Sequence, residues 1–296
     1  MDERTDAAAR RAFWTGKLDE AHAFMQRVRQ QPVKECGEPL VSLAEAAKAA
    51  GVALEFSSQP HVLGLPRLYF LREGLIEPVL AAARDMWARG WVIRIEDGFR
   101  TREMQRQLAR QPYTFDVILK CVLWELDGQP LTAQLVLRRL SALVANTPQV
   151  GTHMSGSAID ISVLDSANGR EIDRGGPYLE MSELTPMDSP FVSQAAQDNR
   201  AATTDLMSGH GFVAYPWEFW HYNSGDASEA VLRGNDQPAR YGPIDVDVTT
   251  GSVQPIHSAL DELNSLADIQ RMLELARRRS ANDASGIQVP DEKLPN

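Results

Sequence analysis

The chain of 296 residues has 43% hydrophobic and 24% charged residues, so it can bury a core without disulfides. Its 40 acidic and 30 basic residues leave a formal net charge of −10, which disfavours a nucleic-acid partner because acidic surfaces repel phosphate. The longest apolar run, Val117 to Leu123, is too short to span a bilayer, so we expect no membrane partner. The charged amino terminus differs from a signal peptide, and we therefore expect a cytoplasmic protein.

The amino-terminal half predicts helices alternating with short strands. Apolar residues at spacings of three and four predict a first helix over residues 6–31, which Pro32 ends. The alternating Val52 to Phe56 segment predicts a strand, and Thr101 opens a helix that extends to Arg110. Further helices are expected over the Ala-rich segment before Gly51 and over residues 78–90, with a strand around residues 92–95.

The carboxyl-terminal half is less regular. Its clearest strand begins at Ala158, and a long loop rich in Gly, Pro and Ser is expected over residues 171–190. The other expected elements are helices over residues 115–144, 195–208 and 258–279, a strand through the aromatic residues 216–223, and a disordered polar tail to Asn296. Helices and strands mixed without a regular βαβ repeat predict an α+β fold.

The first candidate for chemistry is GTHMSGSAIDISV, in which Asp160 follows His153 by seven residues. On a continuous helix the two side chains would lie ~10 Å apart along the axis, too far to share one ion. Gly156 allows a bend, so a loop followed by a strand would bring both side chains to one point. A loop histidine beside an aspartate that caps a turn is the alternative for this segment.

The second candidate is Trp-Glu-Phe-Trp-His at residues 217–221, which contains Glu218 and His221. A carboxylate and an imidazole among aromatic residues are costly to bury unless both are paired or ligated. Aromatic walls also exclude water and strengthen the effect of a metal on its ligands. An interior Glu–His pair within a tryptophan cluster is the alternative.

Considered together, His153, Asp160 and His221 supply two nitrogens and one oxygen. That set suits a catalytic zinc ion whose fourth position is left to water. Glu218 would then act as the general base for the metal-activated water.

Hydrolysis also needs a positive group for the developing oxyanion. Arg100, which follows a predicted strand and the Asp-Gly-Phe turn, is the best candidate. A surface arginine that pairs with Glu96 or Glu103 is the other interpretation.

These motifs resemble those of the zinc peptidases that include D-alanyl-D-alanine carboxypeptidases and share the zinc-binding fold of hedgehog signalling domains. The likeness is carried by His-Met-Ser-Gly-Ser-Ala-Ile-Asp and Glu-Phe-Trp-His. A more detailed similarity, to the vancomycin-resistance type of D-alanyl-D-alanine dipeptidase, covers roughly residues 40–234. It includes GSAIDISVLDSANGREID, the Pro-Tyr-Leu-Glu-Met-Ser-Glu loop, the Asp-Gly-Phe-Arg turn and LREGLIEPVLAAARDMWARGW.

The resemblance implies a small mixed or antiparallel central sheet flanked by helices. It implies that His153, Asp160 and His221 bind one zinc ion per chain, that Glu218 is the catalytic base and that Arg100 polarises the scissile carbonyl. The implied reaction is hydrolysis of the amide bond of D-Ala-D-Ala or a similar short peptide. Such enzymes act in peptidoglycan metabolism or in resistance to glycopeptide antibiotics.

We expect three parts in the chain. A zinc peptidase domain is expected over residues 38–235, between an N-terminal helical extension over residues 1–37 and a C-terminal extension over residues 236–296. The sequence leaves open whether the extensions pack on the core, cover the cleft or form a dimer, and the oligomeric state is equally open.

One position departs from the dipeptidase pattern. The loop of these dipeptidases usually reads Pro-Phe-Asp-Glu-Met, and its aspartate is the expected partner of the substrate ammonium group. Leu179 stands at that position here, and an apolar residue cannot pair with an ammonium ion. Either Glu180 or Glu183 takes over this role, or the enzyme prefers an acylated or longer substrate.

Three functions are therefore considered. The first is zinc-dependent hydrolysis of D-Ala-D-Ala-like peptides, and the second is a D,D- or L,D-carboxypeptidase that acts on muropeptides or blocked peptides. The third is a non-catalytic, zinc-stabilised binding module. Glu218 and Arg100 favour an enzyme, because a structural site needs neither a free base nor an oxyanion donor and tends to complete its coordination with protein.

Overall fold

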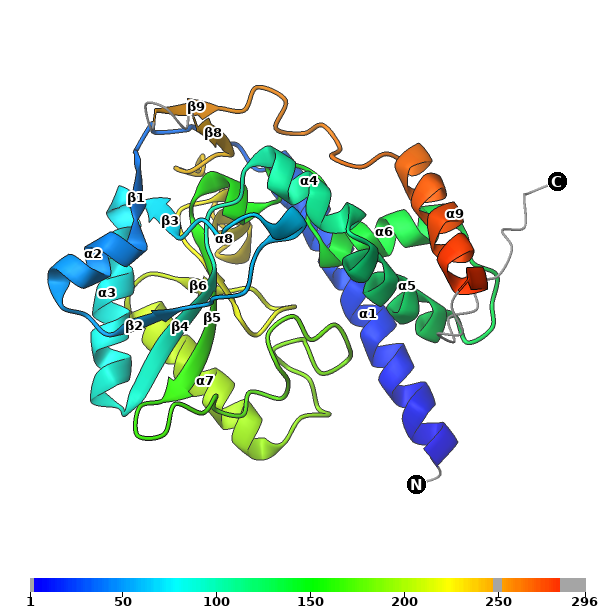
Figure 1. The fold of residues 1–296 in the computed structure, drawn as a ribbon, viewed down its shortest axis with the longest axis horizontal. Coiled ribbons are helices and arrows are strands. Elements are labelled where there is room, and N and C mark those ends of the chain that lie inside the picture. The colour runs from blue at the N-terminus through cyan, green and yellow to red at the C-terminus, as the bar shows by residue number, and fades with distance from the viewer. Residues whose placement is uncertain (1–2, 247–251, 283–296) are drawn as a thin grey trace.

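The structure is a computed structural model that describes residues 3–246 and 252–282. Figure 1 shows a sheet with its covering helices on one side and a group of helices on the other, with the long first helix running along that group. The combination confirms an α+β architecture with a small mixed central sheet. No helix among the described residues is both long enough and apolar enough to cross a membrane.

The central sheet has five strands in the order β2-β4-β5-β7-β6. These strands are β2 (Leu54–Phe56), β4 (Trp91–Asp97), β5 (Ala158–Asp165), β7 (His221–Asn223) and β6 (Val213–Ala214). Only β2 and β4 run parallel, and the other pairs are antiparallel. The apolar residues of this central sheet form one core with those of α2 (Leu43–Ala50), α3 (Glu73–Ala88) and α7 (Gln194–Gly209).

The register of this sheet places polar residues side by side at one point. Asp97 on β4 lies opposite Asp160 on β5, and Asp160 in turn lies opposite His221 on β7. The β4–β5 ladder is irregular between Ile95 and Asp97, immediately before that point. Since β5 is buried from Ala158 to Leu164, Asp160 is a charged residue in the interior of the molecule.

The second group consists of helices with a separate apolar core. It contains α4 (Arg102–Arg110), α5 (Pro112–Leu126), α6 (Ala133–Leu143) and the C-terminal α9 (Leu266–Asn282), joined by Phe115, Leu119, Leu140, Ile269 and Leu273. Helix α1 (Glu3–Gln30) packs along this group through Trp14 and Leu18. Its other end packs through Phe24 and Val28 against Tyr215 and α8 (Ala227–Leu232). Both extension helices therefore pack on the rest of the chain.

Two small sheets complete the described structure. The pairs are β1 (Leu40–Ser42) with β3 (Phe70–Arg72), and β8 (Ile244–Val246) with β9 (Val253–Pro255), both antiparallel.

Several expected elements differ from the observed ones. The single helix expected over residues 115–144 is two helices, because Asp127 and Gly128 adopt positive φ angles of 48° and 85° and end α5. The expected strand over residues 216–223 is a strand only from His221, since the aromatic residues before it form turns. The last helix begins at residue 266 rather than 258. The expected disordered tail lies largely outside the described residues.

Candidate active site and metal centre

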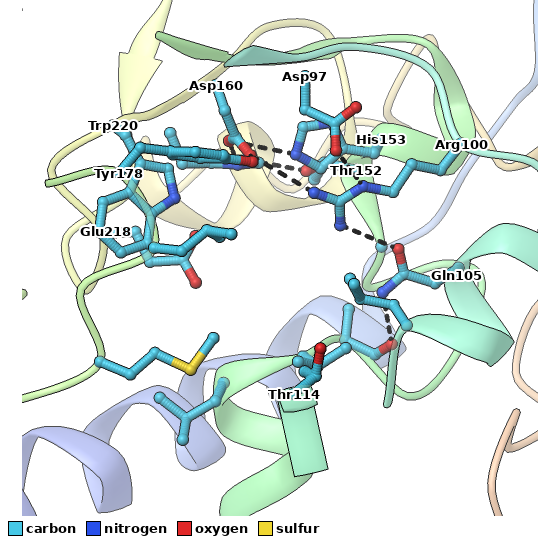
Figure 2. A pocket seen from close by; sticks show the side chains of 18 of the residues that line it. Asp97, Arg100, Gln105, Thr114, Thr152, His153, Asp160, Tyr178, Glu218 and Trp220 are labelled. Atoms are coloured by element: carbon cyan, nitrogen blue, oxygen red, sulfur yellow. Dashed lines mark hydrogen bonds and ion pairs between the residues drawn. The ribbon is translucent and has the colours of Figure 1, made fainter. Parts of the chain in front are cut away.

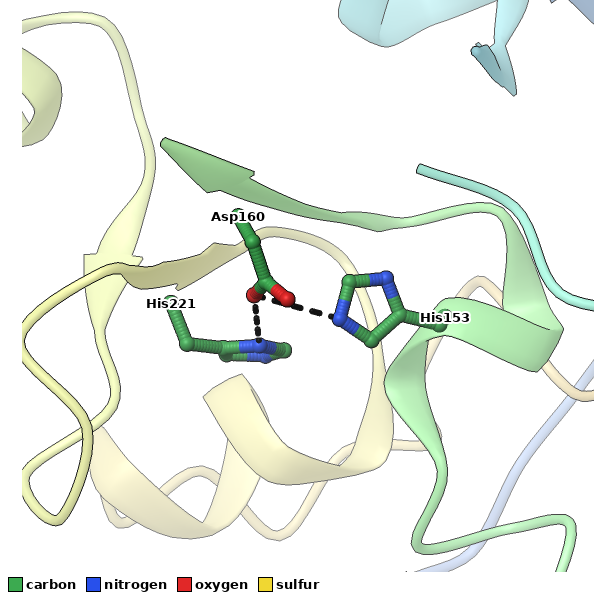
Figure 3. Close-up of side chains that lie close together, drawn as sticks. All are labelled: His153, Asp160 and His221. Carbon is green, nitrogen blue, oxygen red and sulfur yellow. Dashed lines mark hydrogen bonds and ion pairs between the residues drawn. The ribbon is translucent and has the colours of Figure 1, made fainter. Parts of the chain in front are cut away.

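His153, Asp160 and His221 converge, although they come from three separate elements (Figure 3). His153 lies in the short 3-10 helix η2 (Thr152–Ser155), Asp160 on β5 and His221 on β7. One possible ligand atom from each residue lies within 4.8 Å of the other two, and all three side chains are buried. Gly156 makes this possible: its φ of 66° bends the chain between η2 and β5, as the sequence predicts.

The hydrogen bonds of the two histidines fix which nitrogen faces Asp160. His153 Nδ1 lies 2.6 Å from the carbonyl oxygen of Gly98, which can only accept, so Nδ1 is the donor. The other nitrogen of His153, Nε2, lies 3.2 Å from Asp160 Oδ1. His221 Nδ1 lies 2.9 Å from the same oxygen, while its Nε2 lies 2.9 Å from the hydroxyl of Thr152.

This arrangement fits a metal ion. Because Nδ1 of His153 is the donor to Gly98, its Nε2 faces a carboxylate oxygen, and this contact is favourable only when a cation, a proton or a metal ion, lies between the two atoms. Ligand atoms around a tetrahedral ion with bonds of ~2.0–2.1 Å lie about 3.3 Å apart, and the two histidine nitrogens lie 3.2 and 2.9 Å from Asp160 Oδ1. Each histidine also has an oxygen partner on its second nitrogen, as ligating histidines usually do.

Asp160 also orients the groups beside this cluster. Its second oxygen, Oδ2, accepts a hydrogen bond of 2.9 Å from the hydroxyl of Tyr178 and one of 3.4 Å from Arg100. Burial opposes ionisation of Asp160, but the two histidines outweigh it and hold its pKa well below the ordinary value. The carboxylate is therefore ionised, as a metal ligand must be.

Arg100 is a buried residue rather than a surface one, and its partners are not Glu96 or Glu103. Its Nε donates to Asp97 at 2.9 Å, and its Nη1 donates to Gln105 at 3.2 Å (Figure 2). Burial opposes the charge on Asp97, but the Arg100 guanidinium lowers its pKa well below the usual range. The charged pair thus holds the guanidinium rigidly at the edge of the pocket.

Glu218 lines the same pocket, which has a volume of about 740 Å³. It comes from the turn before β7, and Figure 2 shows its carboxylate on the opposite side of the space from Gln105. Burial raises its pKa to about 7, although His221 acts in the opposite direction. It is a carboxylate that can exchange a proton near neutral pH.

A buried arginine ties the turn of Glu218 to the strand of Asp160. Arg174 donates to the carbonyl of Phe219 at 3.2 Å and to the carbonyl of Ile161 at 2.6 Å. Its guanidinium has no ion-paired carboxylate among the described residues, and burial lowers its pKa. Arg174 thus links the residues that directly follow Glu218 and Asp160.

The structure brings together all five residues that the sequence singles out. The structure adds five further residues that the sequence motifs do not single out: Asp97, Tyr178, Thr152, Arg174 and His61. Asp97 lies in the Asp-Gly-Phe-Arg turn and Tyr178 in the Pro-Tyr-Leu-Glu-Met-Ser-Glu loop, both of which carry the family resemblance. These motifs could therefore have indicated that the two residues belong to the site. His61 lies in a loop and contacts Asp97 at 3.4 Å, and nothing in its local sequence indicates that contact.

Gly98 provides a test of how the site is held. A Cβ added at Gly98 would lie 2.8 Å from the carbonyl oxygen of Leu68, which is backbone and cannot rotate away. We expect Gly98→Ala to lower the free energy of unfolding by about 1–3 kcal/mol, because the turn that presents its carbonyl to His153 must shift.

The measurement is urea unfolding, with Gly209→Ala as the control because a Cβ there meets nothing within 4 Å. We expect the control to be neutral or slightly stabilising. Equal stability of Gly98→Ala and the control would contradict the close packing of this turn.

Comparison with known proteins identifies the family. A family model described as D-ala-D-ala dipeptidase, of peptidase family M15, matches residues 68–240. A D-alanyl-D-alanine dipeptidase of Synechocystis is 27% identical over 226 residues, which are 66% of this chain and 85% of that protein. The Escherichia coli D-alanyl-D-alanine dipeptidase is 37% identical over 80 residues, which are 27% of this chain and 41% of that protein.

Among solved structures, the chain is similar to the vancomycin-resistance D,D-pentapeptidase VanY in complex with Zn(II). That alignment has a TM-score of 0.34 and 14% identity and covers 62% of this chain and 93% of the other. The matched range of the family model spans more than half of the chain and contains all five residues described above. The chain belongs to the D-Ala-D-Ala dipeptidase family of metallopeptidases.

Proposed function

We propose that the chain is a zinc-dependent peptidase that hydrolyses D-Ala-D-Ala or a similar short peptide containing D-amino acids. The observation that supports this best is the convergence of three buried ligand atoms within 4.8 Å beside Glu218 and Arg100, all facing one pocket. His153, Asp160 and His221 would hold one zinc ion per chain. When bound, zinc supplies Lewis acidity, which makes a water molecule easier to deprotonate and polarises a carbonyl.

Glu218 and Arg100 have separate tasks in this proposal. The Glu218 carboxylate accepts the proton of the attacking water and can return it to the leaving amine. Arg100 donates hydrogen bonds to the scissile carbonyl oxygen as negative charge develops on it. Since each terminal nitrogen of Arg100 carries two N–H groups, its contacts with Gln105 and Asp160 leave donors for the substrate.

The donor set also argues against a purely structural ion. Among the described residues the cluster contains three protein ligands, whereas structural zinc sites usually have four. These three residues line a pocket of about 740 Å³, so a bound ion would adjoin open space. An open position beside a carboxylate is typical of a catalytic centre, so the binding-module alternative is the weaker one.

Metal content tests the ligands. Wild-type protein should contain about one zinc ion per chain, and His153→Ala or His221→Ala should reduce it to near zero, as measured by elemental mass spectrometry. His210→Ala is the matched control, because His210 pairs with Asp85 at the surface away from the pocket. Full zinc occupancy in both ligand variants would show that the metal binds elsewhere.

A second test separates the base from the ligands. Glu218→Ala should keep its zinc while kcat for D-Ala-D-Ala falls by roughly 10²–10⁴-fold, because the water loses its proton acceptor. Glu103→Ala, an exposed acidic residue of α4 outside this pocket, should keep the wild-type rate. Near-normal turnover by zinc-loaded Glu218→Ala would identify a different base, and zinc-loaded wild-type protein inactive on every short D-peptide would refute the proposed function.

The dipeptidase and the alternative carboxypeptidase differ in whether the substrate has a free ammonium group, so the residue that could bind this group matters. Leu179 is 45% exposed and cannot pair with an ammonium group. Glu183 is already paired with Arg10 at 2.8 Å. Glu180, by contrast, is half-buried, lines the pocket and has no side-chain hydrogen bond among the described residues. We therefore assign recognition of a free ammonium group to Glu180.

Glu180→Gln should raise KM for free D-Ala-D-Ala by about tenfold, since it removes a charge-assisted hydrogen bond, and should leave the N-acetylated compound unaffected. Glu183→Gln is the matched control in the same loop, and steady-state kinetics on both compounds provides the comparison. A preference of the wild type for the acetylated compound, with no effect of Glu180→Gln, would instead support a carboxypeptidase that acts on blocked peptides.

A further inference from the structure

The pocket has two chemically different halves. One half carries the His153–Asp160–His221 cluster, Glu218 and Arg100. The other half is formed by helices, and we call it the helical wall. It consists of the pocket-lining residues Phe24, Met25 and Val28 of α1, Leu108 of α4, Thr114 and Val117 of α5, and Ala142 and Leu143 of α6. Figure 2 shows Thr114 across the open space from Glu218 and Trp220.

The helical wall is neutral and mostly apolar. None of its residues carries a charge, whereas the opposite half contains the carboxylates and guanidinium groups of the site. An anionic group would find no cation on this wall to offset the loss of its hydration. An apolar group, in contrast, would gain by leaving water there. The chemistry of the wall therefore selects for a neutral, apolar ligand group.

The wall is also rigid. The side-chain amide of Gln149 donates to the carbonyls of Val28, Arg29 and Gln31 at 2.9, 3.2 and 3.0 Å and so fixes the carboxyl end of α1. Nearer the N-terminus of α1, Asp19 accepts a hydrogen bond of 2.6 Å from Arg139 of α6. Because α1 is held at both points, the space in front of it is preformed.

The aromatic contacts of α1 connect the wall to the catalytic half. Phe24 lies 5.0 Å from Trp217 between ring centres, and Tyr215 lies 5.5 Å from His221. Tyr215 and Trp217 contact each other at 5.1 Å. The helical wall is thus continuous with the catalytic half of the pocket. One substrate could therefore place a group on the wall while its scissile bond lies at the His153–Asp160–His221 cluster.

The size of the pocket supports a large group. A pocket of about 740 Å³ is of the size that buries ligands much larger than a dipeptide of alanine, whose side chains are single methyl groups. Resting on the proposed function, we propose that the helical wall is a substrate subsite for a bulky apolar group next to the scissile bond. The substrate is then a short D-peptide with a large apolar side chain rather than D-Ala-D-Ala itself.

Three free dipeptides test this subsite: D-Ala-D-Ala, D-Phe-D-Ala and D-Ala-D-Phe. The zinc-loaded wild type should favour at least one phenylalanine compound over D-Ala-D-Ala by about tenfold or more in kcat/KM. Val117→Trp fills the space in front of the wall and should reduce that selectivity ratio at least about tenfold. Leu143→Phe fills the same space with a smaller change and should act in the same direction if the tryptophan variant folds poorly.

Leu123→Trp is the matched control, since Leu123 is a half-buried apolar residue of the same helix that does not line the pocket. Its selectivity ratio should equal that of the wild type. A wild type that prefers D-Ala-D-Ala to both phenylalanine compounds, or equal changes of the ratio in Val117→Trp and Leu123→Trp, would overturn the subsite.

Binding separates this proposal from the proposed function. Calorimetric titration of the Glu218→Ala protein with the preferred phenylalanine compound needs no turnover, and adding Val117→Trp should weaken the affinity at least about tenfold. If the wild type hydrolyses none of the dipeptides while this Val117-dependent binding persists, the peptidase assignment fails and the subsite stands. If binding is equal for D-Ala-D-Ala and the bulky compounds, the subsite fails whatever the activity.

Discussion

The site depends on one carboxylate buried in the middle of the sheet. Asp160 is 2% exposed, and an ionised carboxylate in such a place is stable only if its oxygens are matched by cations or hydrogen-bond donors. Oδ1 faces two imidazoles, and Oδ2 faces Tyr178 and Arg100. The need to compensate this single charge explains why the two histidines, the loop tyrosine and the arginine all meet at one point.

The framework that satisfies this requirement is mostly backbone. The carbonyl of Gly98 orients His153, and the register of β5 against its neighbours places Asp160 between Asp97 and His221. The carbonyls that follow Asp160 and Glu218 are bound by one buried guanidinium, that of Arg174. Backbone groups change position less readily than side chains, so these contacts keep the cluster preorganised. The side chains of the candidate site are thus held in place by the fold itself.

The N-terminal helix extends the site beyond the matched family region. Residues 68–240 contain His153, Asp160, His221, Glu218 and Arg100, whereas α1 lies outside that range and still lines the pocket. It is fixed there by Gln149 and by pairs such as Asp19 with Arg139. The five candidate site residues therefore lie within the matched region, while part of the remaining space is lined by helices around them.

Much of the site could be predicted from the sequence, because most of its residues lie in short motifs whose spacing is visible in the sequence itself. Short motifs such as His-Met-Ser-Gly-Ser-Ala-Ile-Asp carry their spacing with them, and the α+β class follows from the order of apolar patterns. The sequence could not show that Arg100 is buried against Asp97, that Arg174 links β5 to the turn before β7, or that Phe24 lies beside the site. The contacts of Arg174 and Phe24 join residues 45 and about 190 positions apart, which no local pattern encodes, and the burial of Arg100 depends on the elements that pack around it. The sequence by itself determined which side chains can perform the chemistry, and only the tertiary structure decided which of them meet and what encloses them, because burial and register result from packing the whole chain.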